Sequence, residues 1–462
     1  MKRFFTTLIL CLTIEFVLGQ EFPIAVGSDT TFSFRAVYGG LNSIVPILGD
    51  SSNPRSINAQ LVDASGALLG SRISLGATGP FPGAIPLFDG TNYFLVWREF
   101  NGNLKGQFIN TSGSLIGSSI TIATNFSTTE GPVGFAAVYG EASFLVVFTD
   151  NNYVLKGQFV DRSGKLVGNQ ITISSNQQAR DVSLAYDGTN FLACWVRIIP
   201  SKDKDIYGQF VSKTGSLVGN NFLIDGGANY SDNPTSLAFD GTRYLLAFHE
   251  QIPKVDTVDS PWFLYGRFID KTGIVQNTFM ICDSIYHPDI PMVSFGNNKY
   301  LITWTQLTNN SLMGQFYDTT GNKSGSAFEI FDSLNNKIPY GSSIYANNNF
   351  LVIATRLDSN FDNGDVYGKF ITSTTGLPDA ILHNKVFLYP NPASDYITVH
   401  LDGIIMNETT LNIYNLLGAL VKTELLQQNQ KQINVEYLDN GIYLVEIKSK
   451  EWTGKQKLII QR

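Results

Sequence analysis

A repeated motif constrains the fold of this chain more than any other feature. The tripeptide Gly-Gln-Phe, or a close variant of it, recurs at spacings of 48 to 58 residues. The copies begin at Gly106, Gly157, Gly208, Gly266, Gly314 and Gly368, and a degenerate earlier copy is Ala59-Gln60-Leu61. Tandem units of this length indicate a solenoid or a β-propeller, because each unit must bury its apolar surface against its neighbours.

A second marker lies upstream of the tripeptide and predicts the strands of each unit. Asp-Gly-Thr occurs at Asp89, Asp187 and Asp240, each time between two apolar runs. This pattern predicts a hairpin, because a tight turn needs positive φ at its central residues. A Ser/Thr-Gly pair after the tripeptide predicts another turn. Each unit therefore holds four strands, A to D, connected by an A–B turn, a B–C loop, a C–D turn and a D–A loop.

The predicted B strands are apolar on both faces, as residues 93–97 illustrate. Such a strand must be covered on both sides, and four-stranded sheets stacked in a ring provide that cover. The expected fold is all-β, with a seven-bladed β-propeller over residues 20–384. Residues 22–25 resemble a D strand and are expected to complete the last blade. Residues 377–382 are the competing closing strand, and an open solenoid is the alternative architecture.

Residues 1–19 read as a secretory signal peptide. Lys2 and Arg3 precede an apolar run at residues 6–18. Val17 and Gly19 are suitable residues for the −3 and −1 positions of a signal-peptide cleavage site, so we expect cleavage before Gln20. No other apolar run is long enough to span a membrane, so we expect no transmembrane segment. Cys194 and Cys282 fall on different repeat units and are expected to be buried and unpaired.

The charge distribution limits the classes of partner. The formal net charge is −7, and the acidic excess lies in residues 20–384. An acidic body argues against nucleic acid and against anionic membrane surfaces as partners.

The loops predict where a ligand binds. The B–C and D–A loops vary between units, whereas the A–B and C–D turns are nearly identical. Variable loops on a rigid scaffold are where binding residues usually lie, and in a propeller these two loops share one face. The longest B–C loop begins at His249 and supplies Asp256, Asp259 and Trp262. The D–A loops supply Tyr230, Tyr286, His287, Asp289 and Tyr340.

Aromatic side chains beside carboxylates favour a secreted or cell-surface binding protein over an enzyme. An adhesin or a protein that binds an extracellular glycan or protein fits this composition. One alternative is a secreted hydrolase that cleaves a polysaccharide or glycan with paired carboxylates on the variable-loop face. Another is a spacer without a ligand. No catalytic residue is predicted, because the recurring Asp-Gly-Thr turns indicate structure and no Gly-x-Ser-x-Gly elbow is present.

Residues 358–365 are the strongest candidate for a metal site. Calcium prefers about six to eight oxygen ligands, and oxygen-bearing side chains alternate here at Asp358, Asn360, Asp362 and Asp365. The spacing departs from the helix-loop-helix calcium motif, because Gly364 is seventh and Lys369 stands at the twelfth position, where that motif has Glu. Calcium is therefore an alternative to a solvated acidic loop, and no other cofactor is expected. The four histidines lack a spacing typical of zinc ligands.

The last part of the chain, residues 385–462, has a different pattern. Alternating apolar residues at 396–399, 411–414 and 443–447 predict a small Ig-like β-sandwich. A set of ordered motifs accompanies these strands: Tyr389-Pro390-Asn391-Pro392, then Gly418 and Val421, then Leu438, Gly441 and Tyr443, and finally Lys457.

This succession resembles the type A C-terminal sorting domain of the Bacteroidota type IX secretion system. The resemblance implies that the tail binds the secretion machinery and directs the chain, via the periplasm, across the outer membrane. It also implies cleavage near residues 382–386, with the remainder attached to the cell surface or released. The repeats of residues 20–384 resemble an uncharacterised secreted β-propeller repeat array, and that resemblance implies no activity.

Overall fold

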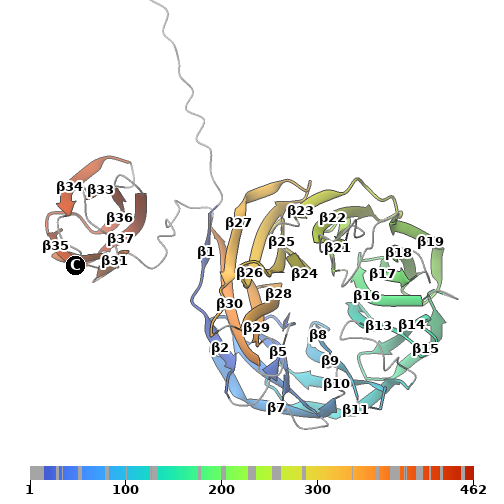
Figure 1. Cartoon of the computed structure of the whole chain (residues 1–462). Helices are drawn as coiled ribbons and strands as arrows, with labels where there is room; N and C mark the ends of the chain where they lie inside the picture. Colours follow the sequence, from blue (N-terminus) through green and yellow to red (C-terminus); the bar gives the residue numbers. More distant parts are fainter. Residues whose placement is uncertain are drawn as a thin grey trace, which may run out of the picture. The chain divides into compact units, whose positions relative to one another are not determined.

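The computed structural model consists of β-strands, and no helix occurs among the residues that it describes (Figure 1). Those residues are 15–27, 31–33, 35–49, 55–78, 83–99, 101–124, 126, 134–174, 178–198, 204–226, 236–251, 262–283, 288–335, 337–358, 364–374, 386–389, 391, 393–401, 409–415, 418–426, 430–448 and 453–462. They belong to two compact units, one of Leu18–Thr372 and one that contains the strands from Val386 onward. A short strand, β1 (Glu15–Leu18), falls within the predicted signal peptide.

The described part of the larger unit contains seven antiparallel sheets, named blades 1 to 7 in chain order. Blade 1 consists of β3 (Thr31–Phe32), β4 (Val37–Tyr38), β5 (Asn42–Gly49), β6 (Arg55–Asp63) and β7 (Leu68–Thr78). Blade 2 consists of β8 (Ala84–Phe88), β9 (Asn92–Arg98), β10 (Leu104–Asn110) and β11 (Leu115–Ala123). Blade 3 consists of β12 (Phe135–Gly140), β13 (Ser143–Thr149), β14 (Leu155–Asp161) and β15 (Leu166–Thr172).

The later blades repeat this meander. Blade 4 consists of β16 (Gln178–Tyr186), β17 (Asn190–Ile198), β18 (Lys204–Ser212) and β19 (Leu217–Asp225). Blade 5 consists of β20 (Ser236–Phe239), β21 (Arg243–Gln251), β22 (Trp262–Asp270) and β23 (Phe279–Cys282). Blade 6 consists of β24 (Pro288–Gly296), β25 (Lys299–Gln306), β26 (Ser311–Asp318) and β27 (Lys323–Phe331). Blade 7 contains β28 (Ile338–Ala346), β29 (Asn349–Leu357) and β30 (Gly364–Thr374).

The blades form a closed ring (Figure 1). The innermost strands β8, β12, β16, β20, β24 and β28 contact one another in succession, β4 contacts β8, and β28 contacts β4 of blade 1. Two strands from the start of the described chain, β1 and β2 (Phe22–Ala25), pair with β30 at the outer edge of blade 7, and β2 pairs antiparallel. The predicted seven-bladed propeller, and its closure by residues 22–25, are therefore confirmed. The competing strand at residues 377–382 lies outside the described residues.

The core of the ring lies between blades, as the two apolar faces of the B strands require. In blade 2, Tyr93, Phe94, Leu95 and Val96 are all fully buried. Phe94 and Val96 pack toward blade 3, whereas Tyr93 and Leu95 pack toward blade 1. Cys194 and Cys282 are buried and free, as predicted.

The Gly-Gln-Phe tripeptide has a structural role in the blades that carry it, as blade 2 illustrates. A Cβ on Gly106 would collide with the ring of Phe94, so only Gly leaves room for that aromatic side chain. The buried Gln107 Nε2 donates to the carbonyl oxygens of Ile116 (2.9 Å) and Gly117 (3.3 Å) on the D strand. Gly117 has a φ of 63° beside a register shift in the β10–β11 ladder. The glutamine therefore satisfies carbonyls that the bulge removes from the ladder.

The Asp-Gly-Thr turns differ from the predicted two-residue hairpin. Only the glycine has positive φ, for example 89° at Gly90. The carboxylate of Asp89 accepts hydrogen bonds from the backbone N–H groups of Thr91 (2.8 Å) and Asn92 (2.7 Å). The aspartate therefore stabilises the turn through its side chain. The copies at Asn297-Asn298 and Asn347-Asn348 do have two residues with positive φ.

The smaller unit is a β-sandwich, as predicted. One sheet has the order β31 (Val386–Tyr389), β32 (Tyr396–Leu401), β35 (Gln430–Asn434). The other has the order β34 (Leu420–Leu426), β33 (Thr409–Tyr414), β36 (Gly441–Lys448), β37 (Thr453–Ile460). Both sheets contribute to one buried core, which includes Ile397, Ile413, Val445 and Leu458.

A charge network around one buried arginine holds the closing strand in place. The guanidinium of Arg356 on β29, only 2% exposed, donates to both carboxylate oxygens of Glu21 at 2.9 and 3.0 Å. It also donates to the Asp332 carboxylate at 2.9 Å. Burial raises the pKa of Glu21, but the hydrogen bond and charge of Arg356, with Lys369, outweigh burial and leave that pKa lowered. Glu21 would be the second residue after the predicted cleavage site, so the network would remain in the mature chain.

Replacing Glu21 tests this network. We expect Glu21→Ala to lower the free energy of unfolding by about 2 kcal/mol, because it removes two charge-assisted hydrogen bonds from a buried arginine. Urea unfolding of the mature chain measures the loss. Glu141→Ala is the matched control: Glu141 pairs with Lys213 on the surface, with side chains 62% and 43% exposed. That variant should change stability much less than Glu21→Ala, because an exposed ion pair is screened by water, and equal losses in the two variants would contradict the role of Glu21.

Candidate functional site

The face formed by the A–B and C–D turns is used for contacts between blades. Arg162, in the C–D turn of blade 3, donates to Asp89 Oδ2 (3.1 Å) and to Thr91 Oγ1 (2.8 Å) in the A–B turn of blade 2. Lys213 of blade 4 reaches Glu141 of blade 3 at 2.7 Å. Lys271 of blade 5 reaches the carbonyl of Asp187 in blade 4 at 3.3 Å. A cation at the same turn position therefore links successive blades.

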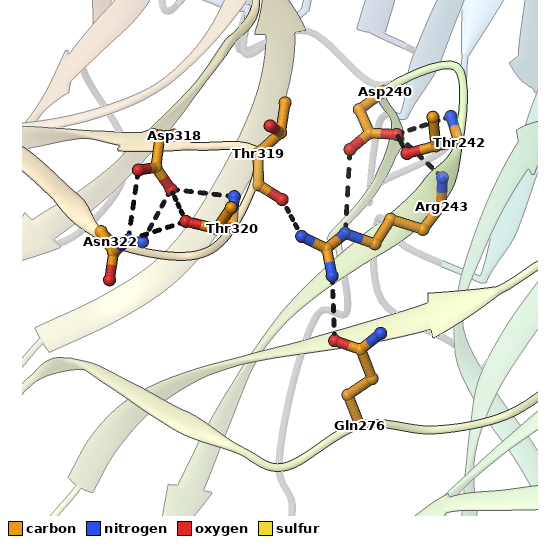
Figure 2. Close-up of polar contacts among 8 residues, drawn as sticks. All are labelled: Asp240, Thr242, Arg243, Gln276, Asp318, Thr319, Thr320 and Asn322. Carbon is orange, nitrogen blue, oxygen red and sulfur yellow. Dashed lines mark hydrogen bonds and ion pairs between the residues drawn. The ribbon is translucent and has the colours of Figure 1, made fainter.

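The link between blades 5 and 6 runs in the other direction, because its cation belongs to the earlier of the two blades, as Figure 2 shows. The cation is now Arg243 in the A–B turn of blade 5, and it donates to the backbone carbonyl of Thr319 in the C–D turn of blade 6. Its guanidinium also donates to Gln276 Oε1 (3.0 Å), lies 4.0 Å from Asp240 Oδ2 and lies above the Phe268 ring. These turn residues thus have structural partners, which favours the opposite face as the functional one.

On the opposite face, the ends of four strands bring together a mixed aromatic and polar cluster, here called the His249 cluster. It consists of His249 on β21, Trp262 on β22, Asp289 on β24 and Tyr340 on β28. His249 Nε2 lies 3.7 Å from Asp289 Oδ1, beyond hydrogen-bond distance. The Trp262 and His249 rings meet edge to face, with centroids 5.5 Å apart. The cluster therefore joins side chains of blades 5, 6 and 7.

Burial controls the protonation of this cluster. The His249 side chain is 1% exposed, and burial lowers its pKa to about 3. Asp289 keeps 37% of its side-chain surface exposed, yet desolvation raises the pKa of its carboxyl, and the N–H of Ile290 offsets part of this effect. Burial, with the charge of Asp289, raises the pKa of Tyr340 to about 12. Titratable groups with pKa values shifted in opposite directions often mark functional sites.

The backbone beside Asp289 is irregular. Ile290 has a φ of 47°, a conformation that β-branched residues rarely adopt, and the β24–β25 register shifts between Asp289 and Met292. The Ile290 N–H donates to Asp289 Oδ1 at 2.9 Å, so the bulge and the carboxylate position each other. Strained backbone of this kind is often kept where it positions a functional group.

The structure brings together part of the predicted ligand site. Trp262 is half-buried at the start of β22 and faces His249. Tyr340 was expected in a D–A loop, but it lies on β28 and is buried with Phe32 and Trp97 because its strand begins earlier than the sequence suggested. The remaining predicted residues lie outside the described residues: Asp256, Asp259, Tyr230, Tyr286 and His287.

The predicted calcium ligands are only partly described. Asp365 lies on β30, where its carboxylate pairs with Lys337 Nζ at 2.6 Å and accepts the Gly27 N–H at 3.2 Å. Asp358 follows β29, whereas Asn360 and Asp362 lie outside the described residues. Among described residues no group of three His, Cys, Asp or Glu is placed to hold a metal. Calcium binding stays a prediction.

Most of the predicted sorting residues that the structure describes help to build the sandwich. Asn391 Oδ1 accepts the Ile459 N–H at 2.8 Å, which ties Asn391 to β37. Gly418 has a φ of 77° in the turn before β34, and Val421 packs against the core. Leu438 is buried, and the Tyr443 hydroxyl donates to the Asp439 carbonyl at 3.0 Å. Tyr389, Gly441 and Lys457 lie on β31, β36 and β37, and Pro390 and Pro392 lie outside the described residues.

The shifted pKa of His249 predicts a pH-dependent stability. Histidine has an ordinary pKa of 6.5, so below this pH His249 binds a proton in the unfolded chain. In the folded chain His249 stays neutral down to about pH 3. Stability is therefore full above pH 6.5 and is lost as the pH falls, by about 2 kcal/mol between pH 7 and pH 5. The raised pKa of Asp289 opposes this loss at lower pH, because the folded state then binds the extra proton.

Urea unfolding at pH 7, 6 and 5 measures this effect in the wild type and in His249→Gln. The variant should show a smaller decrease over this range, whereas Asp289→Asn should keep the decrease. Parallel pH dependences in the wild type and His249→Gln would contradict a neutral, buried His249.

Comparison with known proteins agrees with the two-unit organisation. Residues 387–461 match the family described as the secretion system C-terminal sorting domain. An endo-acting ulvan lyase from Formosa agariphila is 35% identical over 83 residues, which cover 18% of this chain and only 16% of that enzyme. No helix in the described part of the chain has the length and apolar character needed to cross a membrane.

Solved structures similar to the chain include two proteins of low identity. The β-propeller domain of the Trilobed protease from Pyrococcus furiosus is 13% identical, with 76% of this chain and 100% of that chain covered at a TM-score of 0.45. AofleA from Arthrobotrys oligospora is 12% identical, with 69% and 90% covered at a TM-score of 0.42. Residues 387–461 are thus a type IX secretion sorting domain, and the chain, whose larger unit is a β-propeller, is exported to the cell surface or the extracellular space.

Proposed function

We propose that this exported propeller is a binding protein that holds an extracellular glycan or protein on the face of the His249 cluster. The observation that carries this proposal is the division between the two faces. On the turn face, charged side chains recur at equivalent positions and join blades. On the other face, the His249 cluster combines side chains that do not recur in the other repeats.

The chemistry of the cluster suits recognition of a polar ligand with an apolar face. Trp262 offers a partly exposed aromatic surface, on which a sugar ring or an apolar side chain can pack. Asp289 offers carboxylate oxygens that accept hydrogen bonds from hydroxyl or amide groups. Because His249 is neutral at pH 7, the cluster carries no positive charge there and does not favour an anionic ligand.

A hydrolase is the second candidate, and one observation favours it. A general acid in glycoside hydrolysis is a carboxylic acid with a raised pKa, and Asp289 has its pKa shifted in that direction. Such an enzyme also needs a second carboxylate, separated from the first by roughly 5 to 10 Å, across the substrate. In this alternative Asp289 protonates the leaving oxygen.

A binding screen separates these candidates. The chain from Gln20 to Arg462 is tested against arrays of glycans and extracellular proteins, beside Trp262→Ala. We expect Trp262→Ala to weaken binding at least 10-fold, because it removes the aromatic surface, an effect of about 1.4 kcal/mol or more. Tyr396→Ala is the control, since Tyr396 is an aromatic residue of the sandwich with 48% exposure. Equal binding by wild type and Trp262→Ala would contradict this site.

The same glycans are then tested as substrates with Asp289→Asn. A binding protein leaves them intact. Release of reducing ends by the wild type, with a loss of at least 100-fold in Asp289→Asn, would replace the binding proposal by the hydrolase.

Removal of residues 385–462 tests the separation of export from folding. We expect the truncated chain to fold and to stay in the periplasm, because the sandwich has its own core. Cell fractionation with an antibody to the propeller measures its location, and thermal unfolding of the periplasmic protein measures folding. Truncated protein on the cell surface would contradict the role of the tail.

A further inference from the structure

Blade 5 departs from the repeat at two positions that are paired in five of the other blades. In blades 1, 2, 3, 4 and 6 the tripeptide glutamine donates to the carbonyl of a glycine ten residues later, for example Gln107 to Gly117. In blade 5 the glutamine is replaced by Arg267, and the residue ten positions later is Asn277. Blade 5 has therefore lost both partners of this hydrogen bond, and in blade 7 the glutamine is replaced by Lys369.

The two replacements change the edge of the blade. The D strands of blades 2, 3 and 4 begin two residues after their turn glycine, whereas β23 begins at Phe279, six residues after Gly273. Residues 276–278 of blade 5 thus lie outside any strand. Arg267 instead extends to the neighbouring blade, where it donates to the Ile224 carbonyl and pairs with Asp225 at 2.9 Å.

A pocket of about 440 Å³ lies at this position, between the outer strands of blades 4 and 5. β19 contributes Leu223 and Asp225, and blade 5 contributes Arg267, Gln276, Asn277 and Thr278. Two of the lining groups are fixed by neighbours. Arg267 Nε donates to Thr278 Oγ1 at 2.7 Å, and the amide oxygen of Gln276 accepts from Arg243 at 3.0 Å (Figure 2). The pocket therefore has a preorganised polar wall.

The charges in the pocket limit its ligand. Each nitrogen of the Arg267 guanidinium has a protein partner, and Asp225 balances its charge. Because Arg267 and Asp225 neutralise each other, the pocket adds little electrostatic attraction for either an anion or a cation. Polar groups that donate and accept remain along the wall, beside Leu223, which is 50% exposed. A ligand that carries hydroxyl groups next to an apolar C–H face would match these features.

We propose that this pocket binds one neutral saccharide unit, with hydroxyl groups toward Asp225, Asn277 and Thr278 and a C–H face on Leu223. The pocket lies at the outer rim between two blades and does not include the His249 cluster, so the inference goes beyond the proposed function. It gives the propeller a second point of contact along a glycan chain.

The test uses the chain from Gln20 to Arg462 and saturation-transfer NMR with glucose, galactose, mannose, xylose, rhamnose and fucose at millimolar concentration. We expect at least one of these neutral sugars to bind. Arg267→Gln combined with Asn277→Gly restores the arrangement of blades 1, 2, 3, 4 and 6, and we expect it to weaken that binding at least 10-fold. Tyr396→Ala, in the sandwich, should leave it unchanged. Binding that persists in Trp262→Ala and is lost in the double variant separates this pocket from the site of the proposed function.

Thermal unfolding shows whether the double variant is folded. Should it unfold at a lower temperature, Asp225→Asn keeps the shape of the pocket and should weaken binding at least 5-fold. Glucuronate is the charge control, and we expect weaker binding than for the best neutral sugar. Absence of binding by all six sugars, unchanged binding in both pocket variants, or preference for glucuronate would each overturn the proposal.

Discussion

The burial of both faces of the B strands is the constraint on which the rest of this structure depends. A single four-stranded blade exposes one or both of those faces, so it is stable only between two neighbours. Tyr93 and Phe94 illustrate this, because they are adjacent in sequence and pack toward opposite blades. The first and last blades satisfy the same requirement by meeting at β28 and β4, and β2 completes the last sheet. The ring therefore joins residues that are more than 300 positions apart, as the pair Glu21–Arg356 shows.

The two faces of the ring differ in whether their side-chain contacts recur from blade to blade. On the turn face, aspartate side chains stabilise turns within a blade, and cations such as Arg162 and Arg243 join one blade to the next. These contacts recur because each blade meets its neighbour in the same way. On the loop face, and at the rim of blade 5, the side chains do not recur, as with His249, Asp289 and Arg267. The side chains suited to recognise a ligand are therefore those that depart from the repeat, whereas the recurring side chains build the fold.

The sorting domain is a separate sandwich whose motif residues are largely structural. Asn391 holds the start of the domain against β37, and Leu438 is part of its core. Motif residues between Tyr389 and Lys457 that are far apart in sequence thus help to build one folded domain. This explains why the sequence motif predicts export without predicting what is exported.

Much of the fold was predictable, because it depends on local and periodic information. The 50-residue spacing, the turn glycines and the doubly apolar strands indicate seven blades, and the alternation near the end of the chain indicates the sandwich. The sites were less predictable. Tyr340 was expected in a loop and is buried on a strand, and the contact of His249 with Asp289 joins two repeats whose relative position follows from the closed ring. The pocket beside Arg267 had a signal in the sequence, the loss of Gln and Gly ten residues apart, but its other wall comes from Asp225 of the preceding blade. The local sequence pattern predicts the strands and turns of each blade. These sites form between blades, where the packing of residues distant in sequence sets the geometry.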